Sequence, residues 1–422
     1  MSVPSGKLGV HWPHLACAIF IILWLDVGVA TSLMTALPSI MKVGILGAWL
    51  SIAAARSVPF LNTLAINGWP LVVMLVVTVL FVDEVNQSRQ YTQGLGYLLI
   101  AFSLWCFYSQ DQYRRERNLL MGAMAADFAV TGARTVIAVQ SDPRLARYLA
   151  TTEENRTAIY GARDFAGLGG YGFAYSLAAI LLLLLFYVLR AKRQRPTISL
   201  IIAGGLVVLF EMGFTTAIVL TLALGFIFLV QDLIKVIAFR MFIYASAVFG
   251  LIIGLYSSLL NAAAESPLVS DDVSQRFSEL ALYLSGESSN GSDLGTRLDR
   301  WRESIDIVLS SGPLGLAGKT AVKGDTGGHS EWLDLLASYG VLAMLVALFF
   351  VFAWRALRDN TSASEISSLV RPWTFFVVLG FVNTLLFSTI VVTWMFFLPA
   401  LANWLRQQST DRTTEVSLEV RA

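Results

Sequence analysis

Charged residues are scarce in this sequence, and their scarcity excludes a water-soluble globule. Asp, Glu, Lys and Arg make up only 14% of the 422 residues, whereas soluble domains carry about 25% charged residues. Hydrophobic residues make up 56%, and the mean hydropathy is +0.66. The net charge of +1 hides an uneven distribution, because the charges gather in short segments between long apolar runs. The sequence therefore predicts an all-α polytopic membrane protein.

Cysteines, metal-binding motifs and basic stripes are also few or missing. The two cysteines, Cys17 and Cys106, lie inside apolar runs, so they provide no disulfide framework. No Asp-x-Asp pair occurs, and the spacing of His and carboxylate residues matches no zinc or calcium site. The sequence therefore favours metal-independent chemistry without a cofactor. Because no nucleic-acid motif is found either, nucleic acid is not an expected partner.

Long apolar runs predict the membrane helices, each of which needs about 20 mostly apolar residues. The first run is interpreted as an uncleaved helix, because it is longer than the apolar core of about 7–15 residues in a secretory signal. The segment 118–139 carries Asp127 and Arg134, and two pairs of segments are short or tightly joined, so a count of ten or eleven stays open. The twelve candidate spans are 15–34, 40–55, 62–82, 93–109, 118–139, 168–189, 197–211, 214–230, 239–260, 331–353, 372–391 and 393–405.

The Lys and Arg residues of the short loops predict the orientation. They form three clusters: Arg114, Arg115 and Arg117; Arg190, Lys192, Arg193 and Arg195; and Arg355, Arg358 and Arg371. If all three clusters are cytoplasmic, both termini lie inside and two long segments lie outside. The predicted organisation is N-terminal helices 1–139, a first outer loop 140–167, central helices 168–260, a large outer loop 261–328, C-terminal helices 331–405 and a cytoplasmic tail 406–422. No internal or inverted repeat is found, which lowers the expectation of a transporter.

The large outer loop is predicted to contain an amphipathic helix. Thr296-Arg297-Leu298-Asp299 has the pattern of a capping box, and Gly312-Pro313 ends the element. Arg297, Arg300 and Ser304 are expected to lie together beside the apolar side. That apolar side is predicted to carry Leu298, Trp301, Ile305 and Val308.

Arginines of the two outer loops are candidate phosphate ligands. A single outer Arg is ordinarily a solvated or ion-paired surface charge, and Arg297 could pair with Asp293 or Asp299. Guanidinium groups, however, stay charged and bind phosphate through two parallel hydrogen bonds, so several near one membrane boundary indicate a lipid-linked phosphate or diphosphate. The arginines in question are Arg144, Arg147, Arg156 and Arg163 in the first loop and Arg297 and Arg300 in the second.

His329 is the only outer histidine, because His11 and His14 precede the first span. A lone His is more often structural than catalytic, but the surroundings of His329 favour chemistry. Two glycines precede it and let the backbone approach a ligand closely. A helix N-terminus, the positive end of the helix dipole, follows it. Since an imidazole with a near-neutral pKa is the usual general base, we predict that role for His329.

Three acidic residues in or between spans are ionisable groups in costly places, which by default indicates function. Pairing with an interfacial Arg, or a position facing the bundle interior, is the stronger explanation for each of them. They are left without an assigned role: Asp26, Asp127 and Glu211.

The motifs of this region resemble those of the bacterial O-antigen polymerases and ligases. Family members show an Arg followed by Trp four residues on, a Pro-Leu-Gly, and a His opening the span after the large periplasmic loop. Weaker similarity is found at Phe214-Thr215-Thr216-Ala217 and at Arg163-Asp164-Phe165-Ala166-Gly167, and the resemblance covers roughly 161–345. The main matching runs here are Gly295-Thr296-Arg297-Leu298-Asp299-Arg300-Trp301, Pro313-Leu314-Gly315, and Gly327-Gly328-His329-Ser330-Glu331-Trp332-Leu333-Asp334 with Tyr339-Gly340.

The resemblance implies a C-type glycosyltransferase fold in the bacterial inner membrane, with an active site that faces the periplasm. Such an enzyme takes a glycan from undecaprenyl diphosphate, with inversion at the anomeric carbon. A polymerase transfers it to another lipid-linked repeat unit, and a ligase transfers polymer to lipid A-core. Gly-Gly-His-Ser followed by Leu-Asp favours the polymerase branch, and Ser330 stands where ligases often have Asn. A transporter or flippase of lipid-linked glycan is the rival class, and it would place its arginines at the midplane of the bundle.

The resemblance and the residue chemistry together assign the candidate site. His329, Arg297 and Arg163 are the expected catalytic residues, whereas Arg300, Arg147 and Arg156 are expected to bind the diphosphate. No metal or other cofactor is expected. The expected partners are the undecaprenyl-diphosphate-linked oligosaccharide, membrane lipid and a chain-length regulator protein.

The predicted orientation can be tested with reporter tags. Tags at positions 112, 194 and 360 should report the cytoplasm, because they lie in the basic loops, and tags at positions 150 and 285 should report the periplasm. Paired fusions to alkaline phosphatase and green fluorescent protein measure this directly. A cytoplasmic signal at position 285 would contradict the topology and remove the outer site.

Overall fold

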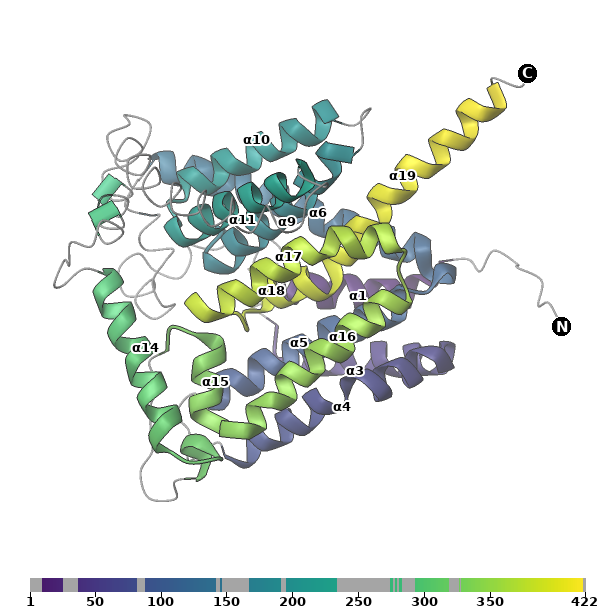
Figure 1. Cartoon of the computed structure of the whole chain (residues 1–422). Helices are drawn as coiled ribbons and strands as arrows, with labels where there is room; N and C mark the ends of the chain where they lie inside the picture. Colours follow the sequence, from purple (N-terminus) through teal and green to yellow (C-terminus); the bar gives the residue numbers. More distant parts are fainter. Residues whose placement is uncertain are drawn as a thin grey trace.

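The computed structural model is helical throughout the residues that it describes. These are residues 10–25, 37–81, 88–141, 145, 167–190, 195–233, 274–275, 278, 281–282, 293–318, 326 and 328–419. No strand occurs among them. The helices, drawn in Figure 1, are α1 (Trp12–Leu25), α3 (Ser39–Arg56), α4 (Val58–Leu80), α5 (Ser88–Tyr108), α6 (Arg114–Ser141), α9 (Tyr171–Arg190), α10 (Arg195–Glu211), α11 (Thr215–Leu233), α14 (Asp293–Ser310), α15 (Glu331–Tyr339), α16 (Met344–Asp359), α17 (Ala363–Val382), α18 (Ser388–Val392) and α19 (Leu398–Glu419).

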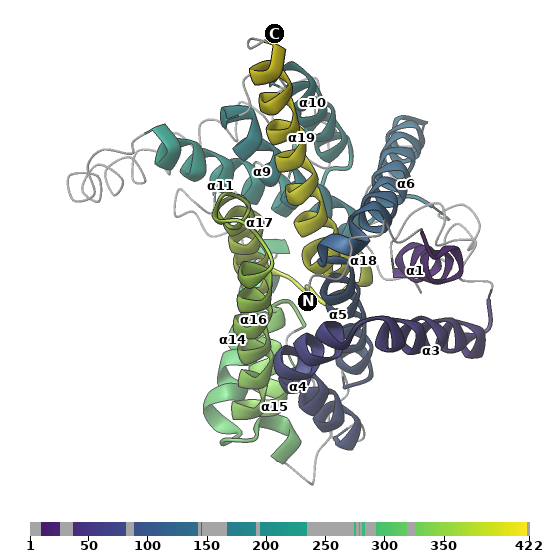
Figure 2. The same ribbon diagram turned by 90° about the vertical axis from the view of Figure 1, so that its right-hand side faces the viewer.

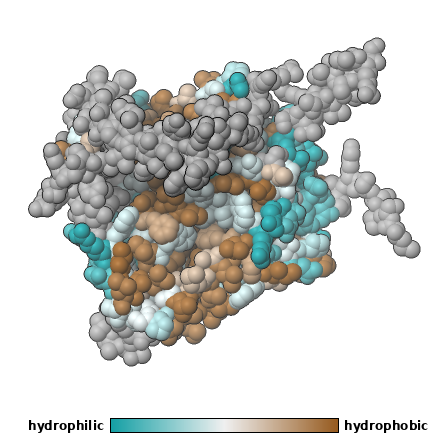
Figure 3. Space-filling view, in the orientation of Figure 1, coloured by the Kyte–Doolittle hydropathy of each residue, from teal (hydrophilic) through white to brown (hydrophobic). Residues whose placement is uncertain are grey.

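The lengths and compositions of these helices are those of a membrane protein. Within the described ranges, seven helical stretches are long and apolar enough to cross a membrane, and α1 and Thr215–Leu229 are shorter apolar helices. Large hydrophobic side chains lie exposed on the outside, such as Val72, Val76 and Val79 on α4. In the view of Figure 3 an apolar surface lies between hydrophilic ends, as a lipid-facing belt requires. The prediction of an all-helical membrane protein is confirmed at this level.

Each predicted span except 239–260 overlaps a helix of the structure, and 239–260 lies outside the described residues. The twelve-span count therefore stays a prediction. The predicted spans coincide with helices because, in hydrocarbon, a helix is the one local structure that satisfies every backbone N–H and C=O group within its own segment.

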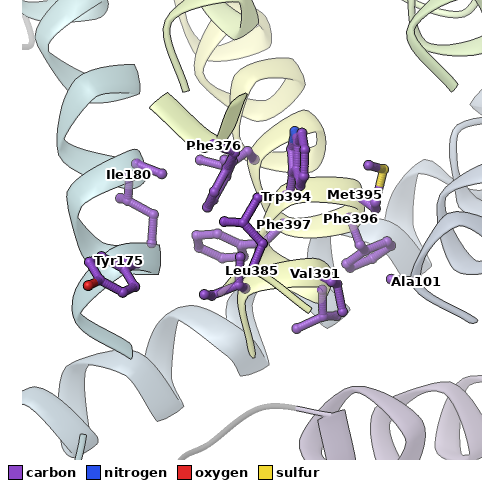
Figure 4. Packing of buried hydrophobic residues seen from close by; sticks show 14 of the residues in the cluster. Ala101, Tyr175, Ile180, Phe376, Leu385, Val391, Trp394, Met395, Phe396 and Phe397 are labelled. Atoms are coloured by element: carbon purple, nitrogen blue, oxygen red, sulfur yellow. The ribbon is translucent and has the colours of Figure 1, made fainter. Parts of the chain in front are cut away.

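The core is built around one buried helical rod. α18, a π-helical turn at Thr393–Phe397 and α19 follow one another, and most of their apolar window is buried. Figure 2 shows this rod between α17 on one side and α6 on the other. Pro399 lacks an N–H group for the helix ladder, and the wider π-turn just before it accommodates that loss. In Figure 4 the rings of Trp394, Phe396 and Phe397 pack with side chains of α5, α9 and α17.

The start of α6, the end of α9 and the start of α17, which lie beside the three basic clusters in the sequence, meet at one end of the bundle. Arg117, at the start of α6, donates to Asn403 of α19 at 2.7 Å, and Tyr187, near the end of α9, donates to the Ala402 carbonyl at 2.9 Å. Arg406 of α19 pairs with Glu365 at the start of α17 at 2.8 Å. We call this the basic end.

The opposite end, which we call the His329 end, joins the other termini of the same helices. The Gly169 N–H donates to Thr135 of α6 at 2.7 Å, and the rings of Tyr171 and Phe214 lie 4.7 Å apart. α14 and α15 lie at this end, at the left of Figure 1. α14, the described helix of the predicted large outer loop, therefore lies at the end opposite the basic end.

The first two histidines lie at the basic end. The His11 N–H donates to Glu116 of α6 at 3.1 Å, and the buried His14 ring stacks on Trp49 with ring centroids 5.5 Å apart. His329 is separated from both along the long axis of the bundle.

The predicted span 331–353 is not one continuous helix. α15 ends at Tyr339, a 3₁₀ turn covers Gly340–Ala343, and α16 continues from Met344. Gly340 has φ +53° and turns the chain, and the Pro313 carbonyl accepts the Val341 N–H at 2.8 Å. Hydropathy could not show this break, because the residues on both sides of it are apolar.

The predicted boundary between the last two spans, at 391–393, is also wrong. α17 ends at Val382, a non-helical turn covers 383–387, and α18 starts at Ser388. Residues 391–393 lie inside the central rod, which continues as α19 through 406–419 of the predicted tail. The turn forms at Asn383 because partners from α15, described below, bind its backbone.

Gly340→Ala should destabilise the protein, because a Cβ at this position would lie 2.0 Å from the Pro313 carbonyl oxygen and the backbone φ is positive. Strain of this kind costs about 1–3 kcal/mol. Gly44→Ala on α3 is the matched control, since its Cβ would meet nothing within 4 Å, and it should be neutral or stabilising. Thermal melting of the detergent-solubilised variants measures both. Equal melting temperatures for the two variants would contradict this packing.

Candidate functional site

His329 lies on a tight turn directly before α15. Gly328 has φ +76°, a left-handed conformation that favours glycine, and it directs the chain into the helix. Ser330 is the N-cap of α15, and its hydroxyl accepts the Leu333 N–H at 3.3 Å. His329 itself is partly exposed, whereas Ser330 is buried. The partly exposed His329 is therefore followed directly by a buried N-cap residue, Ser330.

Asp334 strengthens this cap and ties it to α14. One carboxylate oxygen accepts the Ser330 N–H at 3.0 Å, and the other accepts the hydroxyl of Ser304 at 2.6 Å. Both Asp334 and Ser304 are buried. Hydrogen bonds to a buried carboxylate are strong because the charge has lost its water, so α14 is held firmly against the start of α15.

The buried Glu331 carboxylate binds the turn between α17 and α18. Its Oε2 accepts the N–H groups of Leu385 at 2.8 Å and of Leu386 at 3.2 Å. The Glu331 N–H donates in return to the Asn383 carbonyl at 3.3 Å. Leu385 lies in the buried apolar cluster of Figure 4, and the Asn383 side chain donates to the Tyr175 hydroxyl of α9. The Glu331 side chain thus joins α15 to this turn, and Asn383 of the turn contacts α9.

Ser330 and Trp332 complete this attachment. The Ser330 hydroxyl donates to the Gly380 carbonyl at 3.2 Å, and the Trp332 indole N–H donates to the Val377 carbonyl at 2.8 Å. A Cβ at Gly380 would lie 2.3 Å from the Trp332 ring, so only glycine permits this approach. All three residues after His329 therefore bind the end of α17 or the turn that follows it.

The Pro-Leu-Gly motif packs against the other end of α15. A Cβ at Gly315 would lie 2.4 Å from the Ala337 carbonyl oxygen, and Gly315 has φ +62°. Beside it, the Tyr339 hydroxyl donates to Ser88 of α5 at 2.9 Å. Both ends of this nine-residue helix are thus fixed, and these motif residues have structural roles.

The amphipathic helix α14 differs in detail from the prediction. It begins at Asp293, not at the predicted Thr296 cap, and it ends at Ser310 before Gly312, as predicted. Ser304 is fully buried and Trp301 partly buried, whereas Ile305 is 41% exposed. The prediction that Ile305 lies on the packed side is therefore wrong, because the Ser304–Asp334 hydrogen bond sets the rotation of the helix.

Of the two predicted arginines of α14, the structure describes the side chain of Arg300 but only the backbone of Arg297. Arg300 is exposed. The backbone of Arg297 lies in α14, but its side chain lies outside the described part of the structure. Asp299, one of the partners expected for a structural ion pair of Arg297, pairs with Arg302 at 3.3 Å, and both side chains are exposed.

Several other predicted residues lie outside the described ranges or away from His329. Arg144, Arg147, Arg156, Arg163 and Asp26 lie outside the described residues. Asp127 is partly buried on α6, and Glu211 is the last residue of α10 at the His329 end. Phe214, from the weaker motif, directly precedes α11, which begins at Thr215 at the same end, and Phe214 contacts Tyr171.

The N-terminus of α15, whose positive dipole end follows His329, is occupied by groups of the protein itself. The N–H groups of Glu331 and Leu333 already donate to Asn383 and Ser330. Two buried carboxylates, Glu331 and Asp334, also stand in its first turn and oppose a second anion there. The backbone N–H groups of Glu331 and Leu333 are therefore not free to bind an anion.

Sequence reasoning predicted a role for His329 but did not single out the residues that hold its turn in place. Glu331 belongs to a quoted motif, and an acid at the mouth of a span was the available signal. Asp334 could have been recognised as the acid four residues after the cap. Asn383 and Tyr175 gave no signal, because their roles depend on partners far away in the sequence. Among the described residues, no group of three or more His, Cys, Asp or Glu side chains could hold a metal ion.

Comparison with protein-family models and with curated proteins finds no match to this chain.

Proposed function

We propose that this protein is a polysaccharide polymerase of the bacterial inner membrane. It transfers a glycan from undecaprenyl diphosphate to a hydroxyl of another lipid-linked repeat unit at the periplasmic face. The observation that carries the proposal is the placement of His329. It is partly exposed on the turn directly before the capped and doubly anchored helix α15, beside an amphipathic helix that contains Arg297 and Arg300, at the end opposite the basic end.

His329 suits the role of general base. An acceptor hydroxyl oxygen attacks the anomeric carbon, the bond from that carbon to the diphosphate oxygen breaks, and the hydroxyl proton passes to the imidazole. Such proton transfer contributes about 10²–10⁴ in rate when the base is held in place. The contacts of Ser330 and Trp332 with the end of α17, and of Glu331 with the turn that follows it, supply this rigidity.

Arginines suit the departing lipid diphosphate, on which negative charge develops as the bond breaks. Arg300 is exposed on α14, and Arg297 stands one helical turn earlier in the same helix. Gly167, four residues after Arg163 in the sequence, belongs to the segment that enters the His329 end. Charge-assisted hydrogen bonds contribute about 1.5–3 kcal/mol each, so two or three guanidinium groups provide much of the electrostatic stabilisation.

The arginines favour transfer over transport. A flippase would carry its diphosphate past arginines at the middle of the bundle. Within the described ranges, the buried arginines are Arg117 and Arg371. Arg117 donates to the Tyr108 and Ser109 carbonyls at the basic end, and Arg371 lies over the rings of Phe186 and Phe228. These contacts are structural, and the exposed Arg300 is at the other end.

Replacing His329 and Arg297 should separate two chemical roles. His329→Ala should raise the barrier to turnover by about 3–5 kcal/mol while donor binding stays nearly intact, because only the base is lost. Arg297→Ala should weaken both donor binding and turnover, since guanidinium contacts exist in the ground state and strengthen as the diphosphate leaves. Arg297→Lys should rescue little, because a point charge does not replace the bidentate fork. Steady-state transfer from a synthetic lipid-diphosphate donor measures all three.

Two matched controls separate chemistry from folding. His11→Ala removes an exposed histidine at the basic end, and Arg302→Ala removes an exposed arginine of α14 that pairs with Asp299. Both should retain transfer, with each variant first shown to be inserted and monodisperse. A folded His329→Ala protein with near-normal turnover would remove the general-base mechanism.

Transfer should also be independent of added metal. Neither EDTA nor Mg²⁺ should change the rate of the purified protein, because arginines are proposed to stabilise the leaving diphosphate. The assay above, repeated with and without chelator, provides the measurement. Activity that disappears on chelation and returns with a divalent cation would overturn the arginine mechanism.

A further inference from the structure

Glu331 is a buried carboxylate that the proposed mechanism does not use. It is 3% exposed, and its Oε1 has no hydrogen-bond partner among the residues that the structure describes. Among the described side chains, no Lys or Arg forms an ion pair with it. A buried charge without a cation is costly, and the two backbone N–H groups on Oε2 are the compensation that the structure provides.

The two N–H groups belong to residues outside any helix, so they have no helical carbonyl to donate to. Leu385 and Leu386 lie in the non-helical turn 383–387, where the backbone has left the ladder of α17 and has not yet entered α18. The turn is tightly packed on its other side, because Leu386 lies so close to Gly94 of α5 that a Cβ there would be 2.5 Å from it. Glu331 therefore holds the turn from one side while α5 supports it from the other.

The position of this contact relates it to His329. Glu331 follows His329 by two residues, so their Cα atoms are no more than ~7 Å apart. The Glu331 N–H donates to the carbonyl of Asn383 at the start of the same turn. The backbone of Glu331 therefore binds the first residue of the turn, and its side chain binds Leu385 further along. A change in this contact moves the first turn of α15, and the imidazole moves with it.

We propose that Glu331 is a positioning residue for the transfer reaction. Its carboxylate clamps the 383–387 turn to the start of α15 and thereby fixes His329 in the geometry that proton transfer requires. This role rests on the proposed function. It needs a hydrogen-bond acceptor but no exchangeable proton, which distinguishes it from a second acid or base.

Two variants separate the need for a hydrogen-bond acceptor from the need for an exchangeable proton. Glu331→Gln keeps one carbonyl oxygen that can accept both N–H groups, whereas Glu331→Ala removes the acceptor and leaves the turn unclamped. Glu331→Ala should lower kcat by about tenfold or more with the KM for the donor within about twofold, because the base is misplaced and not the donor. Glu331→Gln should stay within about threefold of the parent kcat and should keep its pH profile.

Glu365→Ala is the matched control for loss of a buried carboxylate. Glu365 is 1% exposed and accepts the Ser362 N–H at 2.7 Å, but it lies at the basic end and pairs with Arg406. It should lower thermal stability without the selective loss of kcat in the molecules that remain folded. If Glu365→Ala reproduces the kcat loss of Glu331→Ala, general destabilisation explains both and the proposal is wrong.

A distance measurement tests the clamp without any assay of transfer. Spin labels at His329→Cys and Phe387→Cys report the separation of the two segments in a Cys17→Ala, Cys106→Ala background, because His329 is partly exposed and Phe387 is 43% exposed. Pulsed electron paramagnetic resonance should give a narrow distance distribution for the labelled parent and for Glu331→Gln. The distribution should broaden or shift in Glu331→Ala.

The outcomes of the two experiments are separable. An unchanged distance distribution in Glu331→Ala overturns the clamp, whatever happens to activity. A Glu331→Gln protein that keeps the parent distance but loses turnover as fully as Glu331→Ala overturns positioning, because the carboxyl proton is then needed. If the parent protein transfers no glycan at all, the proposed function fails, and the distance result still decides whether Glu331 holds the turn.

Discussion

The hydrogen bonds of Glu331 to the turn at 383–387 are the interaction on which the rest of this end of the protein depends. A membrane bundle must satisfy every buried backbone group, and a partly buried break between two long helices exposes several of them. Glu331 accepts two of the N–H groups of the break and donates its own N–H to a third residue of it. The end of α17, the start of α18 and the direction of α15 are thereby set together.

The residues around His329 divide into those that build the helix α15 and those that remain outside it. Ser330, Glu331 and Trp332 bind α17 and its turn, and Gly315 packs tightly against the last turn of α15. His329 stands at the edge of this buried assembly and is partly exposed. Because the three residues that follow His329 are all fixed by hydrogen bonds, the backbone of His329 has little freedom to move. Such preorganisation is what a general base needs.

The attachment of α14 extends the same principle to the large loop. The Ser304–Asp334 hydrogen bond joins a loop helix to the helix that carries the cap of His329. Asp334 also bonds the cap residue itself, so the position of α14 and the geometry of the cap are linked through one carboxylate. Arg300, on the exposed part of α14, is thus placed relative to His329 by rigid elements, and the relation does not depend on a long connection.

Sequence analysis anticipated the features that hydrocarbon imposes on a local segment. Helices such as α4 and α16 follow from apolar runs, and the gathering of basic loops at one end follows from their charge. It missed the turn at Asn383 and the break at Gly340, because each depends on a partner that is distant in the sequence, Glu331 in one case and Pro313 in the other. Ile305 was assigned to the wrong face of α14 for the same reason. His329 was proposed from its neighbours in the sequence, whereas Glu331 was recognised from the structure. The roles of His329, Arg163 and Arg297 stay predictions.

The most direct test of the account is the lipid-linked saccharide that accumulates in a bacterial strain from which this protein has been deleted. A polymerase that joins repeat units on undecaprenyl diphosphate leaves its substrate behind, so mass spectrometry of the lipid fraction should find a single repeat unit on the lipid diphosphate. Expression of the parent protein, but not of His329→Ala, should return the long polymer. Accumulation of full-length lipid-linked polymer would instead identify a ligase, and an unchanged saccharide pool would contradict a role in glycan transfer.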